Sequence, residues 1–225
     1  EIAQCLVGSE MCIRDSSVGI PSGLENGMFQ FGKIALQSLV STLGTAAIAA
    51  NAVANTVSSI STLPGTTISI AMTPVVGRCL GAGDKKQAHR YARLLMLVAC
   101  GGLAVFNLVL YAVIPEITQL FSLSAAATES CIQVVRVFNI VSVFFWGTSF
   151  TLPNALRSGG DARFTMAVSI LSMWLFRVVC SYVLVLGFHA GLLGVWIGMF
   201  IDWTCRSICF VVRFKSGRWT EHKVI

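Results

Sequence analysis

Ionisable side chains are scarce in this sequence of 225 residues. Aspartate, glutamate, lysine and arginine make up 12% of it, whereas hydrophobic residues make up 55%. An average soluble domain carries roughly 25% charged residues, so this chain lacks the polar surface that a soluble globule of its size needs. A disordered chain is excluded as well, because disordered segments are poor in apolar residues and rich in charge. The composition therefore predicts an integral membrane protein.

Motifs typical of enzymes and of metal sites are also missing. The eight cysteines form no CxxC pair, so we expect no metal site. The sequence contains no recognisable nucleophile–base pair, phosphate-binding loop or dinucleotide fingerprint, and we therefore expect no catalytic residue and no enzyme. The net charge of +6 is explained by basic loops on one side of a membrane, so it gives no reason to expect nucleic-acid binding.

Apolar segments of about 20 residues, the length that crosses a bilayer, occur six times. The second segment is interrupted by Pro64, Gly65 and Pro74, which predicts a kink. The pattern predicts an all-α polytopic membrane protein with six transmembrane helices in three hairpins. The expected spans are 24–43, 46–77, 94–114, 131–152, 164–187 and 192–212, within a membrane lobe of 17–213 that is followed by a cytoplasmic basic tail at 214–225.

Basic residues mark alternate loops between these spans. The loops after the second and fourth spans contain lysines and arginines, whereas the three loops on the other side contain none. Because lysine and arginine concentrate on the cytoplasmic side, we predict an integral protein of the plasma membrane with both termini in the cytoplasm. The two basic loops also share a Gly-Asp pair, at 83–84 and 160–161, which indicates a weak internal repeat.

The first 16 residues do not fit this pattern. The segment 1–16 is too short to span a membrane, lacks the features of a signal peptide and has no initiating methionine. Residues 5–16 resemble a translated sequencing adapter. We therefore predict that 1–16 is a non-native or unstructured leader, and we expect the natural chain to continue upstream of Ser17.

Three charged residues are predicted to lie together within the membrane. Each such charge costs roughly 2.5–3.5 kcal/mol at mid-bilayer, so it needs a partner or a task. Arg177 precedes and Asp202 follows the turn near His189 by similar numbers of residues, which places both at one depth. We expect Arg177 and Asp202 to face each other, with Arg206 as a second partner one helical turn away. A structural ion pair is favoured over a role in coupling, and Lys33 stays unexplained.

Glu25 is the carboxylate that best suits ion coupling. It lies in a segment with Pro21, Gly23 and Gly27, where helices can pack closely or bend. Burial there would favour the protonated carboxyl group. Alternatively, Glu25 lies at the cytoplasmic rim of its span and meets water. Both hypotheses stay open at this point.

Two uncharged stripes are candidates for lining a substrate cavity. Polar side chains recur at helical spacing from Asn51 to Thr66, which predicts either a water-filled cavity or hydrogen bonds to a neighbouring helix. A second helical face, between residues 139 and 150, carries an asparagine and two aromatic rings, and such rings opposite a polar face suit an amphipathic organic cation. The predicted cavity residues are Phe29, Asn51, Asn55, Ser58, Thr62, Asn139, Trp146 and Phe150.

Four parts of the sequence resemble one known family, the multidrug and toxic compound extrusion (MATE) family. Residues 19–33 are similar to the opening of its seventh helix, and 50–65 with 76–92 to its eighth helix and the following cytoplasmic loop. Residues 154–166 resemble the family's LRGxGD loop, and 194–219 its twelfth helix and tail. The loop residues that carry the resemblance are Gly81, Gly83, Asp84, Leu156, Arg157, Gly160 and Asp161.

The resemblance implies one lobe of a twelve-helix transporter. Its two lobes surround a central cavity and export drugs or other organic cations in exchange for H⁺ or Na⁺, by alternating access and without a bound cofactor. The partners are then the missing N-terminal lobe of the same chain, the lipid bilayer and a small organic substrate, and Glu25 is the candidate cation-coupling residue. Alternative hypotheses are a flippase or exporter of lipid-linked or metabolite substrates, an intramembrane enzyme, and a channel.

Overall fold

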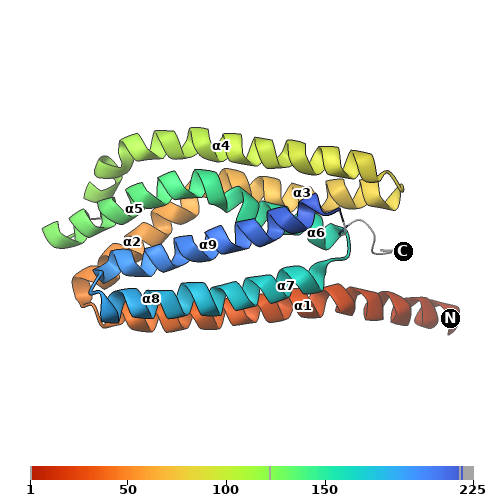
Figure 1. Cartoon of the computed structure of the whole chain (residues 1–225), viewed down its shortest axis with the longest axis horizontal. Helices are drawn as coiled ribbons and strands as arrows, with labels where there is room; N and C mark the ends of the chain where they lie inside the picture. The colour runs from red at the N-terminus through yellow and green to blue at the C-terminus, as the bar shows by residue number, and fades with distance from the viewer. Residues whose placement is uncertain (1, 122, 218, 220–225) are drawn as a thin grey trace.

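Long helices lie side by side in an elongated bundle (Figure 1). The structure, a computed structural model, describes residues 2–121, 123–217 and 219, and in the first helix it describes side chains at residue 20 and from residue 23 onward. The elements in chain order are α1 (Ile2–Ser41), α2 (Thr45–Ser61), α3 (Leu63–Gly81), α4 (Lys85–Gln119), α5 (Ala125–Trp146), the π-helix η1 (Gly147–Thr151), α6 (Leu152–Ser158), α7 (Ala162–Ser172), the π-helix η2 (Met173–Val179), α8 (Cys180–Tyr182), the π-helix η3 (Val183–Gly187) and α9 (Gly191–Lys215).

These elements form six passes along the bundle, and the all-α fold class is confirmed. Four helical stretches of the described chain are long and apolar enough to cross a membrane: Lys85–Gln119, Ala125–Ser158, Ala162–Gly187 and Gly191–Lys215. They correspond to the predicted third to sixth spans. The first two passes, α1 and the pair α2–α3, stay predicted spans. The predicted basic tail is described only as far as residue 217 and at 219, and the remainder lies outside the described residues.

The turns of the bundle gather at its two ends. Figure 1 shows the α3–α4 and α6–α7 turns at the same end as both chain termini, and the α1–α2 and α8–α9 turns at the other end. The two loops predicted to be cytoplasmic thus lie together. This arrangement is the one that alternating basic loops require of helical hairpins.

The leader does not stand apart from the first helix. α1 runs without interruption from Ile2 to Ser41, so residues 2–16 belong to this helix, and a non-native or unstructured leader over 1–16 stays a prediction. This stretch has no proline and only Gly8 as a glycine, so nothing local interrupts a helix that is already nucleated. In Figure 1 this part of α1 projects beyond the ends of the other helices. Its non-native origin stays a prediction.

The second pass is broken close to the predicted kink. α2 ends at Ser61, and α3 begins at Leu63 with Pro64 in its first turn. Proline is tolerated there because the first amides of a helix have no intrahelical acceptor. The polar stripe predicted over residues 51–66 therefore crosses this break, with Thr66 in α3.

The two Gly-Asp loops have the same turn geometry. Gly83 and Gly160 adopt positive φ angles of 78° and 87°. The following amides, Asp84 N and Asp161 N, each donate to a carbonyl five residues earlier at 3.1 Å. This is the Schellman pattern, in which glycine takes the left-handed position that ends a helix. The weak repeat in the sequence thus corresponds to two equivalent helix ends.

A close contact between two passes depends on Gly198 in α9. A β-carbon there would collide with Ser181 Oγ and would lie 3.0 Å from Arg177 O and 3.1 Å from Ser181 N. Gly198→Val is expected to lower the free energy of unfolding by about 1–3 kcal/mol, because the two backbones must separate. Thermal unfolding of the purified protein in detergent measures the loss. Gly101→Val is the control, since a β-carbon at Gly101 meets no atom within 4 Å, and equal melting temperatures for the two variants would contradict the prediction.

Candidate functional site

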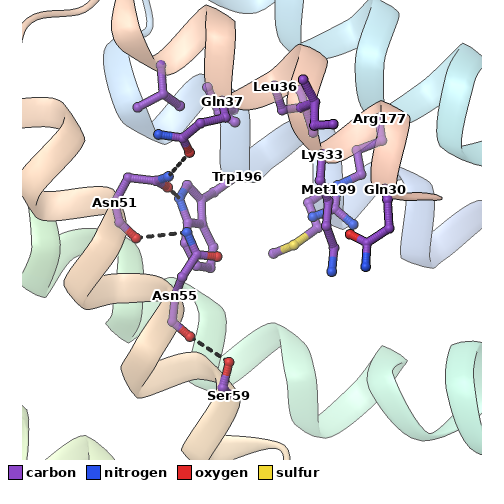
Figure 2. Close-up of a pocket in the computed structure, with 13 residues that line it drawn as sticks. Gln30, Lys33, Leu36, Gln37, Asn51, Asn55, Ser59, Arg177, Trp196 and Met199 are labelled. Atoms are coloured by element: carbon purple, nitrogen blue, oxygen red, sulfur yellow. Dashed lines mark hydrogen bonds between the residues drawn. The ribbon is translucent and has the colours of Figure 1, made fainter. Parts of the chain in front are cut away.

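A polar pocket of about 500 Å³ lies between α1, α2, η2 and α9 (Figure 2). This volume is within the range of small-molecule sites. One side carries the polar groups of α1 and α2, and Leu36, Val195 and Met199 add apolar surface. The lining residues are Gln30, Lys33, Ile34, Leu36, Gln37, Val40, Asn51, Asn55, Ser59, Arg177, Val195, Trp196 and Met199.

A chain of hydrogen bonds orders one wall of the pocket. Trp196 Nε1 donates to Asn51 Oδ1 at 3.2 Å, and Asn51 Nδ2 donates to Gln37 Oε1 at 3.3 Å. Asn55 Nδ2 donates to the backbone oxygen of Asn51 at 2.8 Å. Figure 2 shows these side chains on one side of the pocket. Both asparagines thus line a cavity, and Asn51 also bonds to α1 and α9, whereas Asn55 bonds to the backbone of its own helix.

The charged residues of the pocket are two cations, Lys33 and Arg177. In Figure 2 both lie on the side of the pocket away from Asn51. Aspartate and glutamate are absent from the described residues that line it. Within the part of the chain that the structure describes, neither cation takes part in an ion pair. The pocket is therefore electropositive.

The predicted pairing of Arg177 with Asp202 is not a direct ion pair among the described residues, although Asp202 lies near enough for its charge to act on the Arg177 guanidinium. Arg177 lines the pocket, whereas Asp202 lies in a buried network with Ser172 and Arg206. Equal depth in two helices does not fix which way a side chain points around its helix. Arg177 lies in the π-helical segment η2, whose wider turn displaces side chains from the positions that an α-helical count predicts.

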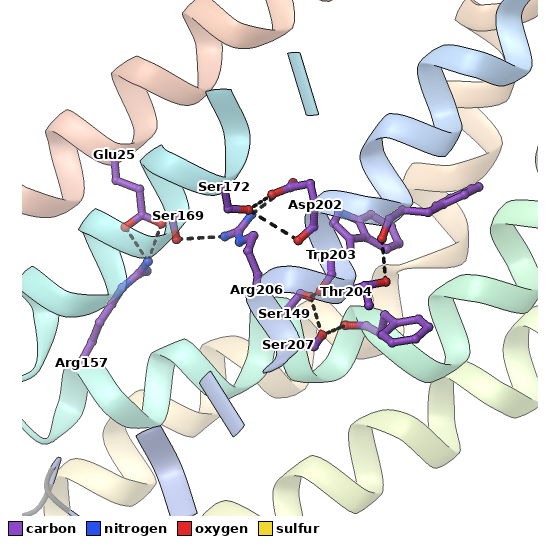
Figure 3. A network of polar contacts seen from close by, with 12 residues as sticks. Glu25, Ser149, Arg157, Ser169, Ser172, Asp202, Trp203, Thr204, Arg206 and Ser207 are labelled. Atoms are coloured by element: carbon purple, nitrogen blue, oxygen red, sulfur yellow. Dashed lines mark hydrogen bonds and ion pairs between the residues drawn. The ribbon is translucent and has the colours of Figure 1, made fainter. Parts of the chain in front are cut away.

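The buried network joins α7 to α9 (Figure 3). Arg206 Nη1 lies 3.9 Å from Asp202 Oδ2, and the two side chains are only 2% and 0% exposed. Arg206 Nη2 donates to Ser169 Oγ at 3.0 Å, and Ser172 Oγ donates to Asp202 Oδ1. Hydrogen bonds of this kind offset part of the cost of burying two charges.

Aromatic rings complete the surroundings of Arg206. Its guanidinium carbon lies 5.1 Å from the ring centroid of Phe29, 4.9 Å from that of Phe150 and 6.0 Å from that of Phe210. Trp146 stacks on Phe150 with centroids 5.2 Å apart. These distances are typical of cation–π contacts. The aromatic faces that suggested an organic cation are thus occupied by a cation of the protein itself.

Glu25 is bound by an arginine from the second Gly-Asp loop. Arg157 Nη2 donates to Glu25 Oε1 at 2.7 Å and to Oε2 at 2.6 Å (Figure 3). Glu25 is 7% exposed, so it is buried in the lobe rather than solvated at a rim. Arg157 Nε also donates to Thr165 Oγ1 at 3.2 Å. The pair links α1 to the α6–α7 turn, a contact that the sequence does not predict.

Three further predicted cavity residues lie outside the pocket. Ser58 Oγ is buried without a hydrogen-bond partner among the described residues, and Thr62 Oγ1 donates to carbonyls of its own helix. Asn139 Oδ1 accepts from Ser61 Oγ at 3.2 Å, in a contact between α5 and α2. Thr62 satisfies local backbone and Asn139 connects two helices, and of the predicted cavity residues only Asn51 and Asn55 line the pocket.

The sequence reasoning missed most of the α1 side of the pocket. Gln30, Lys33 and Gln37 follow one another at steps of three and four residues, which places them on one helical face. This spacing was a readable polar stripe on the first span. Trp196 carries no such pattern, and only its contact with Asn51 identifies it.

The loop residues of the family resemblance have structural tasks in the turns. Asp84 Oδ1 accepts from Gln87 N at 2.9 Å and caps α4. Asp161 Oδ2 accepts from Arg213 Nε at 2.6 Å, which connects the second loop to α9. Leu156 is fully buried beside Trp219 and Phe210 in the core at this end of the bundle. Gly81 is the last residue of α3.

Comparisons with known proteins agree on one kind of molecule. A family model described as MatE matches residues 21–183. The chain is 28% identical over 208 residues to the probable multidrug resistance protein NorM of Thermotoga maritima, covering 92% of this chain and 45% of that protein. It is also 28% identical over 200 residues to the protein of the same name from Bradyrhizobium diazoefficiens, covering 85% and 41%.

A solved structure has the same fold. The crystal structure of a MATE protein in complex with MaL6 superposes with a TM-score of 0.75 at 22% identity, covering 93% of this chain and 46% of the other. The chain therefore spans about half the length of the proteins that it matches. Nearly all of this chain corresponds to one half of the solved molecule.

Proposed function

Because this chain belongs to the MatE family, we propose that it is the second lobe of a secondary antiporter that exports drugs or other organic compounds by alternating access. The observation that carries the proposal is the match of nearly the whole chain to half of a solved MATE protein. A first lobe of similar size completes the transporter around a central cavity. The lobe lies in the plasma membrane with its Gly-Asp loops in the cytoplasm.

Substrate binding belongs to the pocket between α1, α2, η2 and α9. Its volume of about 500 Å³ suits a small organic molecule, and its polar groups come from four elements of the bundle. Both matched NorM proteins are named as probable multidrug resistance proteins, which supports a broad range of organic substrates. The aromatic stripe gives no further support to an organic cation, because Arg206 occupies it.

Ion coupling is assigned to Glu25 and its partner Arg157. H⁺ or Na⁺ that binds Glu25 competes with the guanidinium, whose nitrogen lies 2.6 Å from the carboxylate. Loss of the pair would remove the link between Glu25 in α1 and Arg157 in the last turn of α6. Alternating access requires a coupling element with two states between which an ion can select. The Glu25–Arg157 contact provides such states, one with the pair formed and one with it broken.

Export of a dye from cells tests the proposal. Cells that produce the full-length protein and lack their own exporters are loaded with ethidium or fluorescein, and efflux is followed by fluorescence. We expect efflux that stops when a protonophore collapses the H⁺ gradient, or when an Na⁺ ionophore collapses the Na⁺ gradient. Export that survives both treatments would contradict antiport, and single-channel currents across a bilayer would support a channel instead.

A further inference from the structure

We propose that the pocket recognises the acidic group of an organic anion, such as a carboxylate, sulfonate or phosphate. The inference rests on the proposed function, since it names the substrate class of that transport pocket. The main evidence for the inference is the charge of the side chains that line the pocket. Lys33 and Arg177 both line the pocket, and its described lining residues include no aspartate or glutamate.

Two unpaired cations in a membrane protein call for a counter-ion. A lysine or arginine at mid-bilayer costs roughly 2.5–3.5 kcal/mol, and such residues ordinarily pair with an acid or mark the path of a substrate. Among the described residues no acid forms an ion pair with either side chain, and the one acid whose charge acts on Arg177, Asp202, is already engaged by Arg206 and Ser172. The other buried cation of this region, Arg206, has Asp202 and three aromatic rings around it. Lys33 and Arg177 therefore differ from it in being available to a ligand.

The hydrogen-bond chain adds a neutral donor to the two charged ones. The indole N–H of Trp196 can only donate, so Asn51 must present its oxygen to it and its amide nitrogen to Gln37. Gln37 then accepts through Oε1, and its own NH₂ group is left without a partner among the described residues. The direction of the whole chain follows from a single donor-only group. It leaves the NH₂ group of Gln37 as a donor for a bound molecule.

The remaining surface of the pocket suits the hydrocarbon part of such a molecule. Leu36, Val195 and Met199 line it together with the polar groups. Met199 lies beside Lys33 and Arg177 in Figure 2. Apolar walls exclude water and strengthen charge-assisted hydrogen bonds, which are about twice as strong as neutral ones. An amphipathic organic anion therefore matches the pocket better than an organic cation, which would meet two like charges.

Binding of two dyes of opposite charge tests the inference. Fluorescein is the anionic probe and ethidium the cationic one, and fluorescence polarisation with the purified full-length protein in detergent gives their affinities. We expect fluorescein to bind the wild-type protein, and Lys33→Gln and Arg177→Gln each to weaken it by roughly tenfold or more. Lys33→Arg should keep most of the affinity. Lys86→Gln, an exposed lysine in the first turn of α4, is the matched control and should change nothing.

The outcomes separate this inference from the proposed function. Unchanged fluorescein affinity in Lys33→Gln, or binding of ethidium alone, would overturn the anion site, even if gradient-driven ethidium efflux continues and upholds the antiporter. Fluorescein binding that depends on Lys33 and Arg177 but is never driven by an ion gradient would support the site and contradict the antiporter. Lys33 is exposed, so Lys33→Gln removes no buried contact and should not impair folding. Thermal unfolding verifies that the Arg177 variant is folded.

Discussion

Glu25→Gln is expected to abolish gradient-driven efflux by the full-length protein while leaving its amount in the membrane unchanged. Glutamine has nearly the same shape as glutamate and can still accept a hydrogen bond from Arg157. It cannot take up and release a proton, and it has no charge with which to bind Na⁺. Because coupling needs a group whose partner changes during the cycle, the amide variant should hold substrate without exchanging it for an ion. Dye efflux under an imposed gradient measures the effect.

Glu116→Gln is the control for this experiment. Glu116 is an exposed carboxylate near the C-terminal end of α4 and should tolerate the change. Wild-type efflux by Glu25→Gln would remove Glu25 from the mechanism. Arg157→Gln separates pairing from coupling: it leaves Glu25 buried without its cation, so we expect a loss of folded protein in addition to a loss of efflux.

Arg206→Met is expected to cause the largest loss of stability in the lobe, about 3–5 kcal/mol. The variant removes the cation from Asp202 and leaves a carboxylate that is 0% exposed. It also removes the donor to Ser169 and the contacts with the rings of Phe29 and Phe150. Methionine fills most of the volume, so the effect reports charge and hydrogen bonding more than a cavity. Thermal unfolding in detergent and the yield of folded protein measure it.

Two companion variants test the physical reason. Arg163→Met changes an exposed arginine in the first turn of α7 and should alter stability by no more than about 0.5 kcal/mol. Asp202→Asn combined with Arg206→Met should recover part of the loss, because no uncompensated charge then stays buried. Wild-type stability of Arg206→Met alone would show that the buried pair does not hold α7 to α9.

The path of the chain was largely readable in the sequence. Long apolar segments and basic residues in alternate loops indicated three hairpins, and Pro64 indicated the break between α2 and α3. These features depend on local chemistry: the length of apolar segments, the missing backbone N–H of proline and the ease with which glycine adopts positive φ.

Most contacts of the site could not be predicted from the sequence. Glu25 and Arg157 are 132 residues apart in the sequence, and no local pattern indicates that their side chains are in contact. Arg177 and Asp202 were expected to face each other at one depth, but among the described residues no direct ion pair joins them, and Arg177, in the π-helical segment η2, lines the pocket. Phe29 and Phe150 were expected to line a substrate cavity, whereas in the structure their rings contact the guanidinium of Arg206.

The sequence by itself determined the membrane class, the number of passes, the two equivalent Gly-Asp helix ends and the family. Each follows from composition or from neighbours within a few residues, where periodicity and backbone preference decide the outcome. Only the tertiary structure decided which charges meet. Depth along a helix is set by counting residues, but direction around it depends on helix breaks, π-helical turns and packing, and these separated the paired cation Arg206 from the unpaired cations Lys33 and Arg177.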